Sequence, residues 1–248
     1  MPEATERLAV LIDADNISSD HIADILEELA TFGRATVKRA YGDWSTSRLK
    51  GWREVSNEHA IVQIQQAAYT TRKNSTDFAL IIDAMDLLYS GHVDAFAIVS
   101  SDSDFTRLAT RLRESGRTVY GIGERKTPQS LVNAVDRFIY LEVLGKSATQ
   151  VADAQPEAAE PLPNLQSIVT KAVNRAAQDD GWAHLGTVGS QLHAANASFD
   201  TRLYGFDQLL TLVQAQSYLT VEGTGSATRV ALKGKRAVTR KAAKPKPG

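Results

Sequence analysis

Short apolar runs alternate with longer amphipathic segments between Leu8 and about Leu144. The runs are rich in β-branched residues and typical of strands that are buried in a parallel sheet. We expect strands at Leu8–Ile12, Thr36–Tyr41, Ala60–Ile64, Ala95–Val99 and Thr118–Ile122. We expect helices at Ser18–Thr31, Thr46–Ser56, Thr76–Tyr89 and Phe105–Glu114, and one more with Thr127 as its cap and Pro128 at its first position. This alternation predicts an α/β fold, with a mainly parallel sheet and helices on both of its faces.

A segment rich in Ala, Pro and acidic residues, 146–164, breaks this pattern and predicts a linker. Beyond it the pattern predicts a helix at Leu165–Gln178, two shorter helices and a hairpin across Gly223–Gly225, which together form a small winged-helix domain. The expected shorter elements are Thr187–Ala195, Gly205–Gln216, Tyr218–Glu222 and Thr228–Leu232. We therefore divide the chain into a first domain, a linker, a second domain and a basic disordered tail, at residues 1–145, 146–164, 165–232 and 233–248.

Charge is distributed unevenly, although the net charge is only −1. From Lys233 onward there are seven Lys and Arg residues and no acid, so the rest of the chain is acidic. A basic arm on an acidic body is typical of a protein that attracts polyanions. A solvated tail that aids solubility explains the same pattern, and both interpretations stay open.

The composition limits the cell compartments and the types of chemical site that we expect for this protein. Cysteine is absent, which excludes disulfides, a thiolate zinc site and a cysteine nucleophile, and suits a reducing cytosol. The first residues lack the pattern of a signal peptide, and no apolar run approaches the roughly 20 residues that span a bilayer. We expect a cytoplasmic protein without a membrane partner, whose oligomeric state the sequence leaves open.

Aspartates follow two of the predicted strands: Asp13 after the first, and Asp102 and Asp104 after the fourth. In the common doubly wound strand order, 3-2-1-4-5, these two strands are neighbours, so the three acids converge on one crevice. Clustered carboxylates repel each other unless a cation or shared protons compensate. Because Mg²⁺ and Mn²⁺ prefer oxygen ligands, the pattern indicates metal-assisted phosphodiester or phosphoryl chemistry.

Each acidic block also has a purely structural interpretation. Asp13, Asp15 and Asn16 are typical of a turn or cap, and Ser101–Asp104 fits a capping box. Asp77 begins the long predicted helix, where a carboxylate favours the helix dipole. We interpret Asp15 as a turn residue, and Asn16 as a residue that orients a water molecule or binds phosphate.

Further residues on the predicted helices allow two interpretations. Asp83 lies about 600° of helical rotation beyond Asp77, so the two side chains do not share a face. Arg107, Arg111 and Arg113 form either a solvated helix face or a contact for an RNA backbone.

Taken together, the blocks resemble the NYN domain, a branch of the PIN-like ribonucleases. The matching pieces are Leu11-Ile-Asp-Ala-Asp-Asn16, Tyr41-Gly-Asp-Trp44, Lys73-Asn-Ser-Thr-Asp77, Leu80-Ile-Ile-Asp83, Ile98-Val-Ser-Ser-Asp-Ser-Asp-Phe105 and Gly123-Glu-Arg-Lys-Thr-Pro128. The resemblance implies a PIN-like, Rossmann-like fold and cleavage of RNA that depends on Mg²⁺ or Mn²⁺. The residues that it places at the acidic site are Asp13, Asp77, Asp102 and Asp104, with Asn16 beside them and Asp83 as a possible supporting acid.

The second domain resembles the OST-HTH or LOTUS domain, a winged-helix module linked to RNA binding and protein contacts. The matching pieces are Asp180-Gly-Trp182, Leu185-Gly-Thr-Val-Gly189 and Phe199-Asp-Thr-Arg-Leu-Tyr-Gly205. Trp182, Phe199 and Tyr204 also fit simple core packing, and no basic recognition helix stands out.

We therefore expect a two-domain, metal-dependent ribonuclease that acts on single-stranded RNA, with a C-terminal module that recruits RNA or a protein partner. A non-catalytic RNA-binding adaptor is the main alternative. A haloacid-dehalogenase-like phosphatase is a weaker one, because Asp13-Ala-Asp15 mimics its Asp-x-Asp start but Ile17 stands where that class has threonine or valine.

Overall fold

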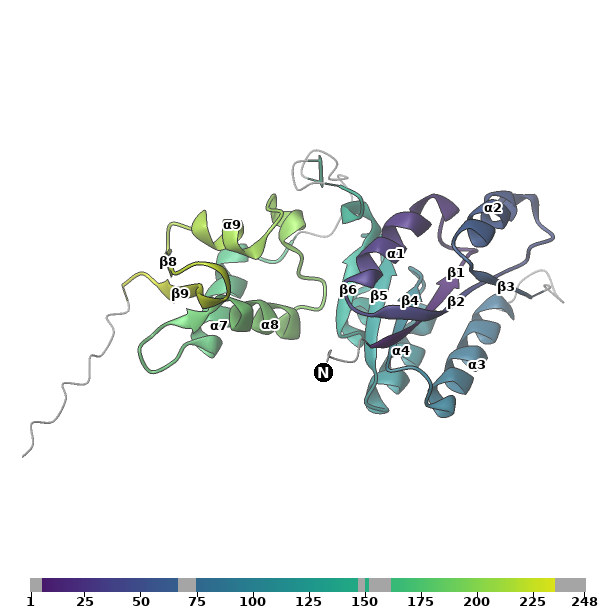
Figure 1. Ribbon diagram of the computed structural model, residues 1–248, viewed down its shortest axis with the longest axis horizontal. Coiled ribbons are helices and arrows are strands. Elements are labelled where there is room, and N and C mark those ends of the chain that lie inside the picture. The colour runs from purple at the N-terminus through teal and green to yellow at the C-terminus, as the bar shows by residue number, and fades with distance from the viewer. Residues whose placement is uncertain (1–5, 67–74, 147–149, 152–161, 235–248) are drawn as a thin grey trace, which may run out of the picture.

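A six-stranded parallel sheet forms the centre of the N-terminal domain (Figure 1). The computed structural model describes residues 6–66, 75–146, 150–151 and 162–234. The strand order is β3-β2-β1-β4-β5-β6, which confirms the predicted doubly wound sheet with β1 beside β4. The strands are β1 Arg7–Asp13, β2 Arg34–Gly42, β3 Val62–Gln65, β4 Ala95–Val99, β5 Thr118–Gly123 and β6 Arg137–Tyr140.

Helices cover both faces of this sheet, as predicted, with α1 and α2 on one face and α3 and α4 on the other (Figure 1). The helices are α1 Ile22–Ala30, α2 Lys50–Glu58, α3 Ser75–Ser90, α4 Thr106–Glu114 and α5 Gln129–Ala134. Short 3₁₀ turns lead into α1, α2 and α4: η1 Ser19–His21, η2 Ser47–Leu49 and η3 Ser103–Phe105. Because the sheet is parallel, both α3 and α4 begin near the edge where β1 and β4 end.

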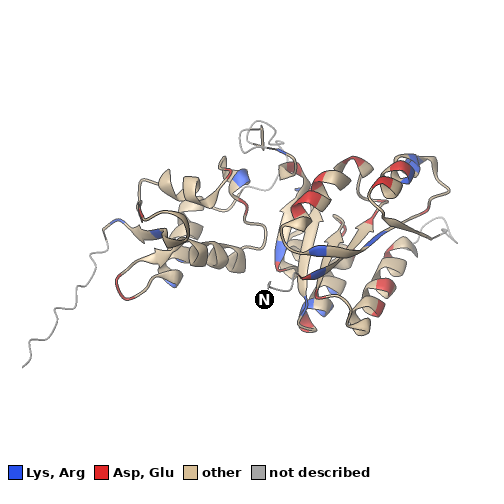
Figure 2. Cartoon of the chain, in the orientation of Figure 1, with Lys and Arg blue, Asp and Glu red and all other residues tan. Residues whose placement is uncertain are grey.

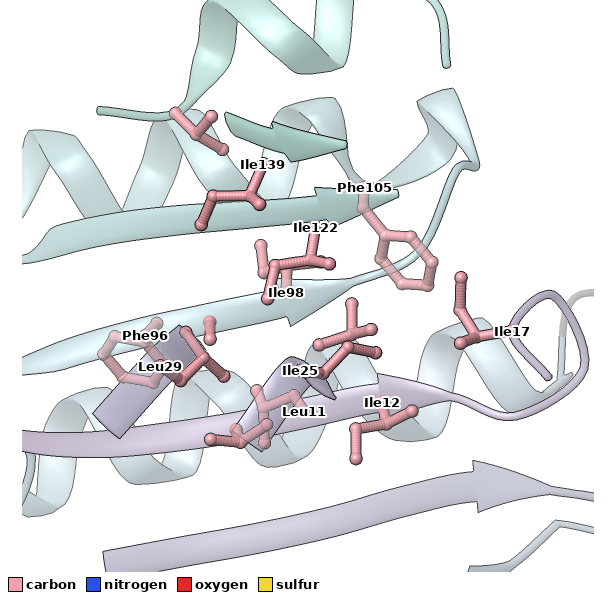
Figure 3. Close-up of a cluster of buried hydrophobic side chains, with 14 of the residues drawn as sticks. Leu11, Ile12, Ile17, Ile25, Leu29, Phe96, Ile98, Phe105, Ile122 and Ile139 are labelled. Atoms are coloured by element: carbon pink, nitrogen blue, oxygen red, sulfur yellow. The ribbon is translucent and has the colours of Figure 1, made fainter. Parts of the chain in front are cut away.

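The two central strands are apolar because helices cover both of their faces. All five residues of β4 are buried, and Leu8 to Ile12 of β1 have no exposed surface. Figure 3 shows Leu11 of β1, Ile98 of β4 and Ile122 of the neighbouring β5, packed in one cluster with Ile25 and Leu29 of α1. Each such side chain contributes about 1.5–3 kcal/mol when it is fully buried, so this cluster stabilises the central strands that carry the acids.

Two details of the first domain differ from the prediction. A sixth strand, β6, was not expected, and it pairs in parallel with β5. Thr127 is not the cap of α5; Pro128 precedes the helix, and the buried Thr127 hydroxyl donates a 2.6 Å hydrogen bond to the Glu124 carbonyl. Pro128 has an extended ψ of 139°, so the helix begins one residue later than predicted.

Three helices and a three-stranded antiparallel sheet form the C-terminal domain, which confirms the predicted winged-helix class. The elements are α7 Leu165–Ala176, β7 Ala183–His184, α8 Leu185–Ala195, η5 Thr201–Tyr204, α9 Leu209–Gln214, β8 Leu219–Glu222 and β9 Arg229–Leu232. The predicted hairpin is the antiparallel pair of β8 and β9, while β7 was not predicted. Phe199 lies in the core of this domain, and Trp182 lies under the guanidinium of Arg229.

The two domains contact each other directly beside β6 (Figure 1). Arg202 of η5 forms an ion pair with Glu28 of α1 at 3.1 Å and with Asp200 at 2.7 Å. The backbone N–H of Phe138 in β6 donates a 2.8 Å hydrogen bond to the carbonyl of Ala197. The C-terminal domain therefore satisfies a backbone donor on an edge strand that otherwise faces solvent.

Some predicted segments lie outside the described residues. These are most of the linker and nearly all of the basic tail, so both stay predictions. No helix in the described part of the chain is long and apolar enough to cross a bilayer.

Candidate metal centre

Three of the predicted acids meet at the edge of the sheet where β4 ends. Asp77 lies in the first turn of α3, Asp102 caps η3, and Asp104 lies within η3. One carboxylate oxygen of each lies within 4.8 Å of the others. The short connection from β4 to α4 places Asp102 and Asp104 there, and the start of α3 brings Asp77 to them.

Asp13 lies behind this group at the end of β1 and is only 1% exposed. Its Oδ2 accepts a 2.7 Å hydrogen bond from the Asn16 side chain and a 2.8 Å hydrogen bond from the Ser100 hydroxyl. Its Oδ1 is buried without any hydrogen-bond partner among the described residues. A buried carboxylate oxygen left without a donor is unfavourable, unless a ligand outside the chain satisfies it.

The electrostatics of the acids follow from their crowding. Burial, together with the charges of Asp13, Asp102 and Asp104, raises the pKa of Asp77 to about 6. Burial also raises the pKa of Asp13, although the hydrogen bonds from Asn16 and Ser100 oppose the shift. No Lys or Arg of the described ranges forms an ion pair with Asp13, Asp77 or Asp102. The repulsion is therefore not compensated by those side chains.

This donor set fits a hard divalent cation. Every candidate ligand is a carboxylate oxygen, which Mg²⁺ and Mn²⁺ prefer over nitrogen or sulfur. The unpartnered Oδ1 of Asp13 and the raised pKa of Asp77 both indicate a site that favours positive charge. The residues present are therefore suitable for one or two such ions.

The other two predicted site residues, Asn16 and Asp83, are not part of the group of Asp77, Asp102 and Asp104. The Asn16 amide is hydrogen-bonded to Asp13, so Asn16 fixes the orientation of that carboxylate. Asp83 lies outside the cluster of Asp77, Asp102 and Asp104, and its two oxygens bind Arg39 and the Tyr41 hydroxyl of β2. Asp83 thus connects α3 to the sheet, and a supporting role for it in catalysis stays a prediction.

Ser100 is a central residue of the site that the sequence analysis did not single out. It is fully buried between β4 and Asp102. Its hydroxyl donates to Asp13 and accepts a 3.1 Å hydrogen bond from the backbone N–H of Asp102, so it connects the acids that follow β1 and β4. Its signals in the sequence are its position directly after an apolar run and its place within the matching piece Ile98–Phe105, and neither indicates its contact with Asp13.

Gly123 allows this turn to pack closely against the end of β5. A Cβ atom at Gly123 would lie 2.7 Å from the carbonyl oxygen of Ser100 and 3.0 Å from the hydroxyl of Ser101. Ser101 is held there because its hydroxyl accepts a 2.9 Å hydrogen bond from the Glu124 N–H. A side chain at position 123 would therefore displace the turn that carries Asp102.

Asp15 lies in a turn, as predicted, and also holds α3 in place. It accepts a 3.1 Å hydrogen bond from the hydroxyl of Thr76 and forms a 2.5 Å ion pair with Arg48. Thr76 directly precedes Asp77, so Asp15 positions the start of α3 and the carboxylate that it carries. The sequence does not reveal this contact, since it joins residues 61 positions apart.

Comparisons with known proteins match two parts of the chain to known domain families. The family model of the NYN domain matches residues 7–142, and that of the OST-HTH/LOTUS domain matches residues 160–231. NYN domains are PIN-like nuclease domains, and OST-HTH/LOTUS domains bind RNA. No curated protein matches the chain.

Two solved structures have similar regions. One is the crystal structure of a protein of unknown function from Vibrio parahaemolyticus, with 21% identity, a TM-score of 0.46 and coverage of 56% of this chain and 94% of that one. The other is the solution structure of an uncharacterized protein from Nitrosomonas europaea, with 31% identity, a TM-score of 0.26 and coverage of 32% of this chain and 86% of that one.

Proposed function

Because the chain belongs to the NYN domain family, we propose that it is a ribonuclease that cleaves RNA phosphodiester bonds with the help of Mg²⁺ or Mn²⁺. The observation that carries this proposal is the meeting of Asp77, Asp102 and Asp104 within 4.8 Å. The buried and unpartnered Oδ1 of Asp13 next to them supports it independently.

Asp77, Asp102 and Asp104 hold the metal in this proposal, with Asp13 behind them. A divalent ion held by these residues would supply the positive charge that favours activation of water for in-line attack and that stabilises the charge on the phosphate and the leaving oxygen. Without that ion the four carboxylates repel the phosphates of a substrate.

The other polar residues of the site keep the acids in place. Asn16 and Ser100 orient Asp13, and the contact of Asp15 with Thr76 fixes the start of α3. Such supporting contacts allow a site to keep close to one productive geometry.

The OST-HTH/LOTUS domain supplies RNA binding to the catalytic domain. Charged residues are concentrated in the N-terminal domain, while the C-terminal domain shows few of them (Figure 2). The C-terminal domain therefore does not owe its affinity for RNA to a strongly basic groove. We propose that residues 165–248 raise the affinity for single-stranded RNA, with the basic residues from Lys233 onward contributing a salt-dependent part.

The test compares labelled single-stranded RNA incubated with and without Mn²⁺ for the wild type, Asp102→Asn and Asp13→Asn. Each substitution keeps the shape of the side chain but removes its charge, so we expect cleavage to fall by at least about a hundredfold. Mn²⁺ binding, measured by isothermal titration, should weaken in the same variants. Asp86→Asn is the matched control, because Asp86 is exposed on α3 outside the cluster and should behave as wild type.

Two outcomes would contradict the proposal. Full activity of the double variant of Asp13 and Asp102 would assign the cleavage to a contaminating nuclease. A wild-type protein that binds RNA and Mn²⁺ but never cleaves would be an RNA-binding adaptor.

A further inference from the structure

An aromatic side chain lies exposed directly beside the acidic cluster. Phe78 follows Asp77 in the first turn of α3, and 60% of its surface is exposed. Two more apolar side chains of α3 are equally exposed, Ile82 at 62% and Tyr89 at 73%. A single exposed apolar residue is ordinary, but three on one helix form a surface that requires an explanation. We refer to Phe78, Ile82 and Tyr89 as the α3 stripe.

The spacing of the α3 stripe puts its members on one side of the helix. Ile82 lies four residues after Phe78 and Tyr89 seven residues after Ile82, and each step is within about 40° of whole helical turns. Tyr89 shows which way this side faces, because its hydroxyl accepts a 3.4 Å hydrogen bond from the Arg111 guanidinium of α4. The α3 stripe therefore lies on a solvent-exposed side of α3 that reaches toward α4 at Tyr89, and α4 is the helix that follows Asp102 and Asp104.

Exposed arginines line α4. Arg107 and Arg111 are one turn apart on α4, and both are exposed. Arg107 lies three residues after Asp104 and forms no ion pair with any residue that the structure describes. Arg113 differs, since it is paired with Asp136 at 2.9 Å. Positive charge thus lies next to the acidic cluster, on the side where Phe78 is exposed.

We propose that Phe78 is a stacking platform for an unpaired RNA base next to the scissile phosphate, and that Arg107 and Arg111 bind the phosphates of the same strand. The inference rests on the proposed ribonuclease function and deepens it, because it names the residues beside the acids that bind the bases and phosphates of the strand. Bases of a duplex are stacked on one another and are not available to an exposed phenyl ring, whereas unpaired bases stack on aromatic side chains.

The size and charge of the surface favour RNA over a protein partner. Three side chains bury about 600 Å² at most, which is below the roughly 800 Å² per partner of a stable protein interface. A strand of RNA matches all three parts of the surface: bases for Phe78, phosphates for the arginines and a cleavable bond for the acids. A protein face offers no phosphodiester bond for the acids.

The experiment measures binding of a labelled single-stranded oligonucleotide to the full chain. It is done in an Asp102→Asn background so that the RNA is not consumed. We expect Phe78→Ala to weaken binding by about tenfold or more, in line with the contribution of one stacked base, and Phe78→Tyr to restore it. Arg107→Gln should weaken binding and lower the slope of log affinity against log salt by about one.

Matched controls lie elsewhere on the same domain. Val62→Ala removes an exposed apolar side chain on β3, and Arg34→Gln removes an exposed arginine at the start of β2, away from the acidic edge. Both should bind within twofold of the background protein. Thermal melting and Mn²⁺ titration of Phe78→Ala in the otherwise wild-type chain should match the wild type, because the side chain is exposed and offers no ligand.

The outcomes separate this inference from the proposed function. If the wild type cleaves RNA but Phe78→Ala binds and cleaves as well as the wild type, the stacking platform is rejected while the ribonuclease stands. If the wild type does not cleave RNA at all, the proposed function is rejected first. If the wild type sediments as a dimer that Phe78→Ala dissociates without any change in RNA binding, the α3 stripe is a protein interface and the inference is wrong.

Discussion

Two clusters of charged residues are built in opposite ways. At the edge of the sheet, Asp13, Asp77 and Asp102 crowd together, and no described cation forms an ion pair with them. At the domain interface, Arg202 is held between Glu28 and Asp200, and the three side chains keep only 19%, 17% and 11% of their exposure. Both clusters contain partly buried charge, but only the second pairs it with opposite charge within the chain.

The difference indicates what each cluster is for. Paired charges at the interface satisfy one another, so they act as a fixed contact between the domains. Crowded like charges make the folded protein less stable on their own and persist where a ligand of opposite charge binds. Removing one charged side chain should therefore lower the free energy of unfolding at the domain interface and raise it at the edge of the sheet.

The largest effect is expected at the interface. Arg202→Met keeps much of the volume of the side chain but leaves Glu28 and Asp200 without their cation. Removing one partner of a buried pair costs 3–5 kcal/mol, and the remaining exposure of these groups reduces the expected loss of unfolding free energy to about 2–3 kcal/mol. Urea or thermal unfolding measures the change.

An exposed ion pair provides the control for this variant. Lys126→Met breaks the 2.6 Å pair with Glu124, in which Lys126 is 74% exposed, and should cost less than about 1 kcal/mol. Equal losses in the two variants would mean that the interface pair has no special role. Limited proteolysis should also cut Arg202→Met faster between its domains.

The interface illustrates what the sequence does not reveal. Glu28 and Arg202 are 174 residues apart, and each looks like an ordinary surface charge until both domains are placed. The edge strand β6 was missed for a related reason, because Arg137–Tyr140 is short and follows α5 without a clear turn signal. Long-range contacts of this kind depend on three-dimensional packing, which no local pattern encodes.

More of the acidic edge of the sheet than of the domain interface could be predicted from the sequence. Buried parallel strands are apolar throughout, so Leu8–Ile12 and Ala95–Val99 were recognisable, and the acids that follow them had to lie at one edge of the sheet. Asp77 came from the resemblance to the NYN domain rather than from any pattern. Ser100 was beyond reach, since its hydroxyl donates to Asp13, a residue 87 positions away that only the fold brings near it.

A smaller effect of opposite sign is expected at the acidic edge. The raised pKa of Asp77, about 6 against an ordinary 3.8, means that ionised Asp77 is disfavoured in the folded protein. Its contribution to stability is fully present below pH 4 and is lost as the pH rises through 6. Asp77→Asn should therefore stabilise the metal-free protein at pH 8 by about 1 kcal/mol, after the loss of a favourable helix-dipole contact is subtracted.

Unfolding measurements of Asp77→Asn at another pH and with added Mn²⁺ test this prediction further. At pH 3 the variant and the wild type should unfold alike, because Asp77 is then mostly protonated in both the folded and the unfolded wild type. Added Mn²⁺ should stabilise the wild type and have little effect on the variant. A variant that is less stable than the wild type in EDTA at pH 8 would show that the crowded acids are not under electrostatic strain.

The smallest expected effect returns to the interface and concerns His193 of α8. Its ring packs edge-on against Phe199 at 5.7 Å, and its Nδ1 is buried with no hydrogen-bond partner in the described part of the chain. Burial, with the nearby charge of Arg137, lowers its pKa to about 4, while Asp200 opposes the shift. The unfolded chain takes up the proton near pH 6.5, so the folded state loses stability as the pH falls from 6.5 to 4.

We expect His193→Gln to remove this loss. The shift sets an upper limit of about 3 kcal/mol, and partial solvation reduces it to about 1 kcal/mol between pH 7 and pH 4. Urea unfolding at a series of pH values measures the difference between variant and wild type, in which the titration of the acidic cluster cancels. His184→Gln, at an exposed position on β7, should keep the wild-type pH dependence. If His193→Gln loses as much stability as the wild type over this range, His193 is protonated in the folded protein and the interface tolerates its charge beside Arg137.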